Sequence, residues 1–347
     1  MRTVDDLAPA PDTALDDAAE SEPTTRPSVS VIVPAFNEAL VIEATLVALH
    51  EYMQELTERY EWEIVVVDDG STDETLQIAN EFAAAHDDVR VLRHRVNFSL
   101  GQALRTAFNN CTSDYLVVID CDLTYAPEHV GRLLDAIVTT HARIVIASPY
   151  MPGGRSTGVP FLRNVASRTA NRILGLAASG RLHTLTGMVR AYDRRFVTAL
   201  NLKAMGSEVN TEIIYKAQLL RAHIVEIPAH LDWTAMRGLP RRSTMRLASS
   251  TIRSLLSAFI FRPFMFFIIP GVVFAILGVA GLIWTVGHGG AEDSLREYHL
   301  ASEALLGISS LMLFLGIITL QSKRYFEELF HLGTSILREI RDPRSRD

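Results

Sequence analysis

Short apolar runs alternate with longer amphipathic stretches through the first 150 residues of the chain. The runs lie at 29–33, 64–67, 89–92, 115–119 and 144–147. Each is too short to cross a membrane, and near-continuous apolar runs of this length are typical of strands buried on both faces of a parallel sheet. Helical patterns at 39–56 and 73–85 separate the first three runs. The alternation predicts an α/β fold with a doubly wound, mainly parallel sheet.

Two longer apolar runs follow, at 264–286 and 304–322, and neither contains a charged side chain. A helix of about 20 apolar residues spans the roughly 30 Å of hydrocarbon in a bilayer, so both runs are predicted to be transmembrane helices. Basic residues flank the two runs at their outer ends in the sequence: Arg262 precedes the first run, and Lys323 and Arg324 follow the second. The connecting segment 287–303 contains only one arginine. The positive-inside rule then predicts that the part before residue 264 and both termini are cytoplasmic and that 287–303 is an external loop.

Charge is concentrated at the amino end of the 347-residue chain, whose formal net charge is −7. Residues 1–27 hold seven acids and two arginines and lack the apolar stretch of a signal peptide, so they are predicted to be a disordered acidic tail. The rest of the chain is near neutral, so it lacks the overall positive charge that is typical of proteins that bind nucleic acid. Its two cysteines are too few for a disulfide framework or a structural zinc site.

Acidic residues follow three of the predicted strands, at 34–38, 68–71 and 120–122. In a doubly wound sheet, ligands bind at the carboxyl ends of the strands. Asp120 and Asp122 point the same way on extended backbone, so they can share one Mg²⁺ or Mn²⁺ whose remaining ligands are diphosphate oxygens. Any surface turn can contain such a DxD sequence, and the 68–73 segment can equally be a turn with a helix cap. A carboxylate there can also accept the imino hydrogen of a uracil or guanine ring.

Five motifs in this order resemble the family 2 glycosyltransferases, which have a GT-A fold: 31–38, 65–73, 97–105, 114–128 with its DxD, and 150–154. Segments 185–192 and 212–228 resemble the polyprenyl-phosphate branch of that family, which also ends in membrane helices. The resemblance extends over residues 28 to 341. One departure is Pro149, which stands where dolichyl-phosphate mannosyltransferases have an arginine, so mannose specificity is not implied.

The resemblance implies roles for particular residues, position by position. The nucleotide-sugar site would comprise Pro34, Phe36, Glu38, Val67, Asp69, Asp120, Cys121 and Asp122. Asp120 and Asp122 would bind the metal, with Asp122 as the principal ligand. Glu212 would be the general base if the acceptor is a hydroxyl, and Arg190 would assist at an acceptor phosphate.

Between 237 and 262 there are six arginines and no acids, interleaved with apolar residues at helical spacing. Such a segment is expected at the membrane surface. Arginine binds phosphate with two parallel hydrogen bonds, so Arg237, Arg241, Arg242 and Arg246 are candidates to bind an acceptor phosphate. The alternative interpretation is a simple anchor on anionic headgroups.

The sequence therefore predicts a membrane-bound, metal-dependent, inverting glycosyltransferase. It would move one sugar from a UDP or GDP sugar to a polyprenyl phosphate, for cell-envelope glycan synthesis or protein glycosylation. The alternatives are transfer to a hydroxyl of a lipid-linked glycan and a catalytically silent membrane scaffold. The predicted parts are the tail (1–27), a GT-A catalytic domain (28–236), a basic juxtamembrane segment (237–263), helices 264–286 and 304–322 joined by 287–303, and an amphipathic cytoplasmic end (323–347).

Overall fold

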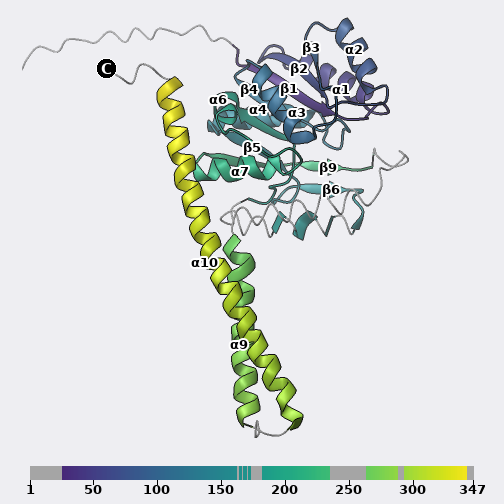
Figure 1. Cartoon of the computed structure of the whole chain (residues 1–347). Coiled ribbons are helices and arrows are strands. Elements are labelled where there is room, and N and C mark those ends of the chain that lie inside the picture. Colours follow the sequence, from purple (N-terminus) through teal and green to yellow (C-terminus); the bar gives the residue numbers. More distant parts are fainter. Residues whose placement is uncertain are drawn as a thin grey trace, which may run out of the picture.

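The computed structural model of the chain describes residues 26–161, 164–165, 167–169, 171–172, 182–234, 263–287 and 293–341. They form an α/β domain and a long helical hairpin that projects from it (Figure 1). Residues 1–25 of the predicted tail and most of the predicted juxtamembrane segment lie outside the described residues.

A seven-stranded sheet with the order β3-β2-β1-β4-β7-β5-β8 forms the centre of the domain. Its strands are β1 (Ser28–Ala35), β2 (Glu61–Asp68), β3 (Val89–Arg93), β4 (Tyr115–Val118), β5 (Ile144–Ser148), β7 (Arg190–Asp193) and β8 (Ile224–Pro228). The first five coincide with the apolar runs of the sequence. Only β7 runs antiparallel to its neighbours, β4 and β5. The predicted doubly wound, mainly parallel sheet is confirmed.

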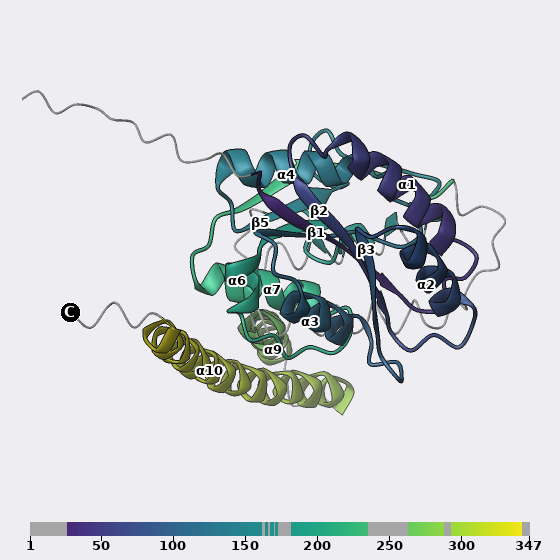
Figure 2. The same ribbon diagram turned by 90° about the horizontal axis from the view of Figure 1, so that it is seen from above.

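Helices cover both faces of this sheet, and each face has its own apolar core. The described helices of the domain are α1 (Ile42–Glu55), α2 (Thr75–Ala85), α3 (Leu100–Asn110), α4 (Glu128–Thr140), α6 (Arg194–Thr198) and α7 (Val209–Leu219). Figure 2 shows α1 and α4 on one face and α3, α6 and α7 on the other. Successive residues of β2 alternate between the two cores, because side chains of a strand point to opposite faces: Val66 belongs to the core on the α1 and α4 face, and Val67 belongs to the core on the α3 face.

A small parallel pair, β6 (Arg155–Thr157) and β9 (His230–Asp232), lies beside the main sheet. The backbone N–H of Asp232 donates to the carbonyl of Thr124 at 2.8 Å. This bond ties the small sheet to the loop that follows β4, where the sequence has its DxD motif.

The hairpin consists of α9 (Pro263–Gly287) and α10 (Asp293–Arg341). Both are long and apolar enough to cross a membrane, over Phe266–Gly287 and Leu295–Ser322. Small residues allow close packing between them, as is common in membrane helix pairs. A Cβ on Gly281 would lie 2.2 Å from Ser302 Oγ, and Ser309 Oγ donates to the Gly271 carbonyl at 2.8 Å.

The helix boundaries differ from the sequence ranges in one respect. Helix α10 already begins at Asp293, within the segment 287–303 that is predicted to be a loop, and it continues without interruption to Arg341. Polar residues can extend a helix beyond its apolar stretch because its hydrogen bonds are local, so the apolar run marks the candidate span and not the ends of the helix.

Candidate active site

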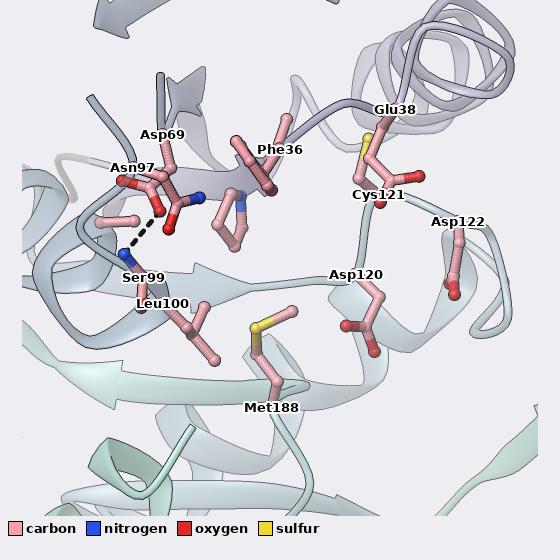
Figure 3. Close-up of a pocket in the computed structure, with 13 residues that line it drawn as sticks. Phe36, Glu38, Asp69, Asn97, Ser99, Leu100, Asp120, Cys121, Asp122 and Met188 are labelled. Atoms are coloured by element: carbon pink, nitrogen blue, oxygen red, sulfur yellow. Dashed lines mark hydrogen bonds between the residues drawn. The ribbon is translucent and has the colours of Figure 1, made fainter. Parts of the chain in front are cut away.

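A cavity of about 370 Å³ opens at the carboxyl ends of β1, β2 and β4 (Figure 3). In the sheet, β2 and β3 lie on one side of β1 and β4 lies on the other, so the strand order changes direction here. Ligands of doubly wound sheets bind at such a switch point. The lining residues are Pro34, Ala35, Phe36, Glu38, Asp69, Asn97, Ser99, Leu100, Ala103, Asp120, Cys121, Asp122 and Met188.

Asp69, at one end of the cavity, holds the loop between β3 and α3 in place. Its carboxylate accepts hydrogen bonds from the backbone N–H groups of Phe98, at 3.0 Å, and Ser99, at 2.8 Å. Gly70 allows the loop between β3 and α3 to lie close to the end of β2. Its φ is +71°, and a Cβ there would lie 2.4 Å from the backbone carbonyl carbon of Val96. A carboxylate has about four lone-pair positions, so Asp69 can accept a further hydrogen bond from a ligand.

The loop after β1 is fastened to the loop after β2 by side chain to backbone hydrogen bonds. The Asn37 side-chain oxygen accepts from the Thr72 N–H at 2.7 Å, and the Glu38 N–H donates to Thr75 Oγ1 at 2.7 Å. Asp73 accepts from the N–H and hydroxyl of Thr75. Burial opposes ionisation of Asp73, but these bonds outweigh it, and the pKa of the carboxyl is lowered. The bonds fix the cavity wall that carries Phe36 and Glu38.

The DxD segment forms the opposite wall. Figure 3 shows the carboxylates of Asp120 and Asp122 pointing to the same side of the loop. The Thr124 N–H donates to Asp122 Oδ1 at 3.0 Å, and Leu123 adopts a left-handed φ of 52°, so a tight turn follows directly. This turn holds the Asp122 carboxylate at the mouth of the cavity.

Cys121 lies between these two acids and is almost completely buried. Burial raises the pKa of its thiol, and the charges of Glu38, Asp122 and Asp120 raise it further, so the thiol stays protonated at neutral pH. The Cys121 carbonyl accepts a hydrogen bond from Thr45 Oγ1 of α1 at 2.8 Å. The residue therefore anchors the backbone of the DxD loop and offers no reactive thiolate.

Oxygen ligands in this position suit a hard divalent cation such as Mg²⁺ or Mn²⁺. Among the described residues, no group of three or more His, Cys, Asp or Glu side chains is arranged to hold a metal ion. Two carboxylates leave most of the coordination sphere of such an ion to other ligands. The donor set therefore fits an ion that is bound together with an anionic ligand.

Three of the residues singled out in the sequence are not brought to the cavity. Val67 is completely buried in the core under α3. Arg190 is also completely buried and donates to the backbone carbonyls of Asn210, at 2.8 Å, and Leu185, at 2.6 Å. Its guanidinium thus ties the segment before β7 to the start of α7.

Glu212, the third of these residues, is engaged within α7 and the loop before it. Its carboxylate accepts from the N–H groups of Lys203 and Ala204 at 2.8 to 3.0 Å and pairs with Lys216 at 2.6 Å. These contacts leave Glu212 in a structural position, away from the residues that line the cavity.

The structure also adds residues that the sequence did not single out as site residues. Asn97 and Ser99 line the cavity from the loop before α3, Leu100 and Ala103 line it from the first turn of α3, and Met188 lines it from the segment before β7. The first four fall within the 97–105 motif, which was the available signal. Met188 falls within the segment 185–192, and the pairing of β7 with β4 places it at the cavity. The four candidate acceptor arginines, Arg237, Arg241, Arg242 and Arg246, lie outside the described residues.

Comparisons with known proteins agree with this architecture. Residues 30–200 match the family described as glycosyl transferase family 2. Polyprenol monophosphomannose synthase of Mycolicibacterium smegmatis is 33% identical over 220 residues, which cover 61% of this chain and 80% of that protein. Dolichol-phosphate mannosyltransferase of Pyrococcus furiosus is 30% identical over 227 residues, which cover 65% of this chain and 60% of that protein.

Among solved structures, glucosyl-3-phosphoglycerate synthase from Mycobacterium tuberculosis, in complex with Mn²⁺, UDP and phosphoglyceric acid, is similar with a TM-score of 0.52. The two are 20% identical, and the match covers 68% of this chain and 78% of that one. At this identity the likeness establishes the fold alone, which is GT-A-like.

Proposed function

The chain belongs to the family 2 glycosyltransferases, and from that premise we propose that it transfers one sugar from a nucleotide-diphosphate sugar to a polyprenyl phosphate. The observation that carries the proposal is the cavity whose walls present Asp69 at one end and Asp120 and Asp122 at the other. The named activities of the relatives support the acceptor class, since two of them act on polyprenol or dolichol phosphates.

In this proposal the nucleotide occupies the half of the cavity lined by Pro34, Phe36 and Asp69. The Asp69 carboxylate accepts the imino hydrogen of the base, while Phe36 offers a ring for stacking. Asn97 and Ser99 add polar groups to the same wall. Uracil and guanine both carry such a hydrogen, and the proposed donor is a UDP or GDP sugar.

The diphosphate lies toward the other half, lined by Glu38, Asp120 and Asp122. A divalent cation held by Asp120 and Asp122 would neutralise the leaving diphosphate. The new bond joins an acceptor phosphate oxygen to C1 of the sugar, and the bond from C1 to the diphosphate breaks, with its electron pair leaving on the diphosphate. Attack from the opposite face inverts C1.

A phosphate acceptor explains why the cavity needs no dedicated base. The carboxylate nominated as a base from the sequence, Glu212, is bound to two backbone N–H groups and to Lys216. A phosphate monoester is already an anionic nucleophile, and its transfer depends mainly on positioning and on charge stabilisation. The position of Glu212 therefore favours a phosphate over a hydroxyl acceptor.

A donor panel tests the proposal. The full chain in detergent with Mn²⁺ is given UDP and GDP sugars and a short polyprenyl phosphate, and the glycolipid product is measured. The matched control is the same polyprenol without its phosphate. Product from the phosphate alone supports the proposal, whereas equal product from the free alcohol contradicts the acceptor class. Absence of both transfer and Mn²⁺-dependent donor binding would favour a silent scaffold.

We also propose that α9 and α10 anchor the enzyme in the cytoplasmic membrane, with the catalytic domain on the cytoplasmic side. Single cysteines replacing Ser21, Ser294 and Ser345 test this arrangement. The native Cys111 and Cys121 are both buried, so a membrane-impermeant maleimide should react only with the introduced thiols. We expect Ser294→Cys to react from outside and the other two variants to react only after the membrane is opened.

A further inference from the structure

A second, larger hollow of about 1440 Å³ lies on the domain, and we call it the basic groove. Its walls come from the end of α3, the residues just before β5, helix α6 after β7, and the turn between α7 and β8. Strands β5 and β8 begin at this edge and the antiparallel β7 ends at it. The cavity of the candidate active site lies at the carboxyl ends of the parallel strands. The groove lies at their amino ends, on the opposite side of the domain.

The formally charged side chains that line the groove are all positive. Five arginines line it, and no described carboxylate does: Arg105, Arg143, Arg194, Arg195 and Arg221. Arg143 is paired with Asp193, and Arg105 donates to the carbonyls of Leu202 and Ala204. Arg195 and Arg221 are exposed, and no ion pair joins either of them to a carboxylate of the described residues. An anionic partner would neutralise these two charges directly.

We propose that the acidic segment 1–25 of this same chain binds in the basic groove. That segment carries seven carboxylates, Asp5, Asp6, Asp12, Asp16, Asp17, Glu20 and Glu22, against the single arginine Arg2. Its charge is complementary to that of the groove. The proposal is independent of the transferase activity, since the groove and the cavity lie at opposite edges of the sheet.

The segment is attached at the same end of the strands as the groove. The backbone N–H and the hydroxyl of Ser28, the first residue of β1, both donate to Asp114 Oδ2, at 3.0 and 2.8 Å. The carbonyl of Asp114 in turn accepts from the N–H of Arg194, a groove residue, at 3.1 Å. Ser28 and Arg194 are thus both in contact with Asp114. The segment itself joins Arg26, which donates to the Thr57 carbonyl and lies 4.0 Å from Glu61 at the start of β2, so it is attached at the same end of the strands as the groove.

Tethering favours this occupant over a partner that arrives from solution. Twenty-five extended residues reach roughly 80 Å, so the segment can reach every part of the groove. Covalent attachment raises the effective concentration of the segment at the groove to the order of millimolar. Weak charge-assisted contacts are enough for binding at that concentration.

A distance measurement on the full chain tests the proposal. Spin labels are placed on Ala14→Cys in the segment and on Asn109→Cys at the groove, and distances are measured by pulsed electron resonance in nanodiscs of uncharged lipid. The native cysteines are buried and stay unlabelled. We expect a short, narrow distance peak that is lost in about 1 M NaCl, where the Debye length is about 3 Å.

Charge reversal identifies the groove as the binding surface. Arg195→Glu combined with Arg221→Glu should abolish the short peak. The matched control is Arg95→Glu with Arg132→Glu, which changes the net charge equally at the opposite edge of the sheet and should keep the peak. Thermal unfolding of each variant verifies that the domain is folded.

Several outcomes would overturn the proposal. A broad distribution in the chain without the charge reversals, or a peak that survives them, would mean that the segment does not bind in the groove. A short distance between two copies labelled only at Asn109→Cys would assign the groove to a second copy of the chain. Loss of the peak when anionic lipid replaces the uncharged lipid would assign it to lipid headgroups.

Discussion

His94 supports Asp69 from behind the cavity, with its Nδ1 at 2.8 Å from Asp69 Oδ1. Both side chains are less than a tenth exposed. An ionised carboxylate can only accept, so Nδ1 must carry the proton. The other ring nitrogen lies 2.8 Å from Thr106 Oγ1 on α3. The ring is therefore fixed at both ends, and it holds the carboxylate in the orientation that faces the cavity.

This relationship predicts that His94→Ala weakens donor binding. The variant loses a hydrogen bond of about 1 kcal/mol that positions the Asp69 carboxylate. If donor binding weakens by that amount, the donor KM rises roughly fivefold. The acceptor KM should not change. His94→Gln, which retains a donor, should recover part of the loss, and His223→Ala serves as a control at an exposed histidine outside the cavity. Equal effects on donor and acceptor constants would indicate general loss of structure instead.

A second prediction concerns the metal. Asp122→Ala should reduce transfer by about a hundredfold or more. The variant would lose the metal ion that neutralises the charge developing on the leaving diphosphate. Asp120→Ala should be nearly as damaging, whereas Asp87→Asn, at an exposed acid on another surface, should leave activity unchanged. Calorimetry of donor binding with and without Mn²⁺ separates metal loss from unfolding. Full activity of Asp122→Ala in EDTA would contradict metal dependence.

The arginines before α9, the first candidate membrane helix, give a third prediction. Arg241→Ala combined with Arg242→Ala should raise the acceptor KM by about tenfold or more, since each bidentate contact to a charged group contributes about 1.5 to 3 kcal/mol. Donor affinity should change little. A rise in donor KM instead would assign the pair to the diphosphate, and release from the membrane with both constants unchanged would identify a surface anchor.

The fourth prediction is a pH dependence of stability that originates at His129. Its Nδ1 lies 2.9 Å from the Ala126 carbonyl, and its Nε2 accepts from the His230 N–H at 3.1 Å, so the ring is neutral. Burial lowers the pKa of His129 below its ordinary value, and the charges of Arg132 and His230 lower it further, against the opposing effects of the Ala126 bond and Glu128.

Because the folded pKa is below the unfolded value of about 6.5, the unfolded chain takes up the proton first as the pH falls. The stabilisation is present above pH 6.5 and is lost below it, with a slope of at most about 1.4 kcal/mol per pH unit. Denaturant unfolding between pH 7.5 and 5 measures this slope. His129→Gln, which does not titrate, should flatten it; an unchanged slope would assign the effect to another group.

The hairpin gives a fifth prediction. A Cβ on Gly278 would lie 2.8 Å from Leu306 Cγ and 3.1 Å from the Ser302 carbonyl, so Gly278→Leu should force α9 and α10 apart. Overpacking of this kind costs about 1 to 3 kcal/mol. Gly307→Leu is the matched control, because no atom lies within 4 Å of the Cβ position there. Thermal unfolding in detergent should distinguish the two variants; equal melting temperatures would refute the close packing.

The strands β1 to β5 could be predicted from the sequence because each is a local apolar run between helical patterns, whereas the sixth parallel strand, β8, lies outside the predicted runs. Strand β7 could not, since it contains a buried arginine and its place between β4 and β5 depends on pairing with residues distant in the chain. The short strands β6 and β9 have mixed polar and apolar residues and gave no pattern.

At the candidate site the carboxylates could be predicted, because acids after strand ends gather at one edge of the sheet. The motif match identified Val67, Arg190 and Glu212 as well, but a match of residue types does not state where each side chain points. Val67 lies on the core face of β2, and the two charged residues bind backbone groups instead of facing the cavity. Met188 lies in the segment 185–192 that carries the resemblance, but its place at the cavity depends on the strand order.

The unbroken course of α10 has a mechanical consequence. Its 49 residues make a rod of about 74 Å, more than twice the hydrocarbon thickness of a bilayer. Because the helix is unbroken, the angle about its axis between residues within the candidate span and residues beyond it is fixed. One residue inserted after Ser322 would turn everything that follows by about 100° about the helix axis. The direction in which the carboxyl-terminal turns face is thus set by the packing of α10 against α9.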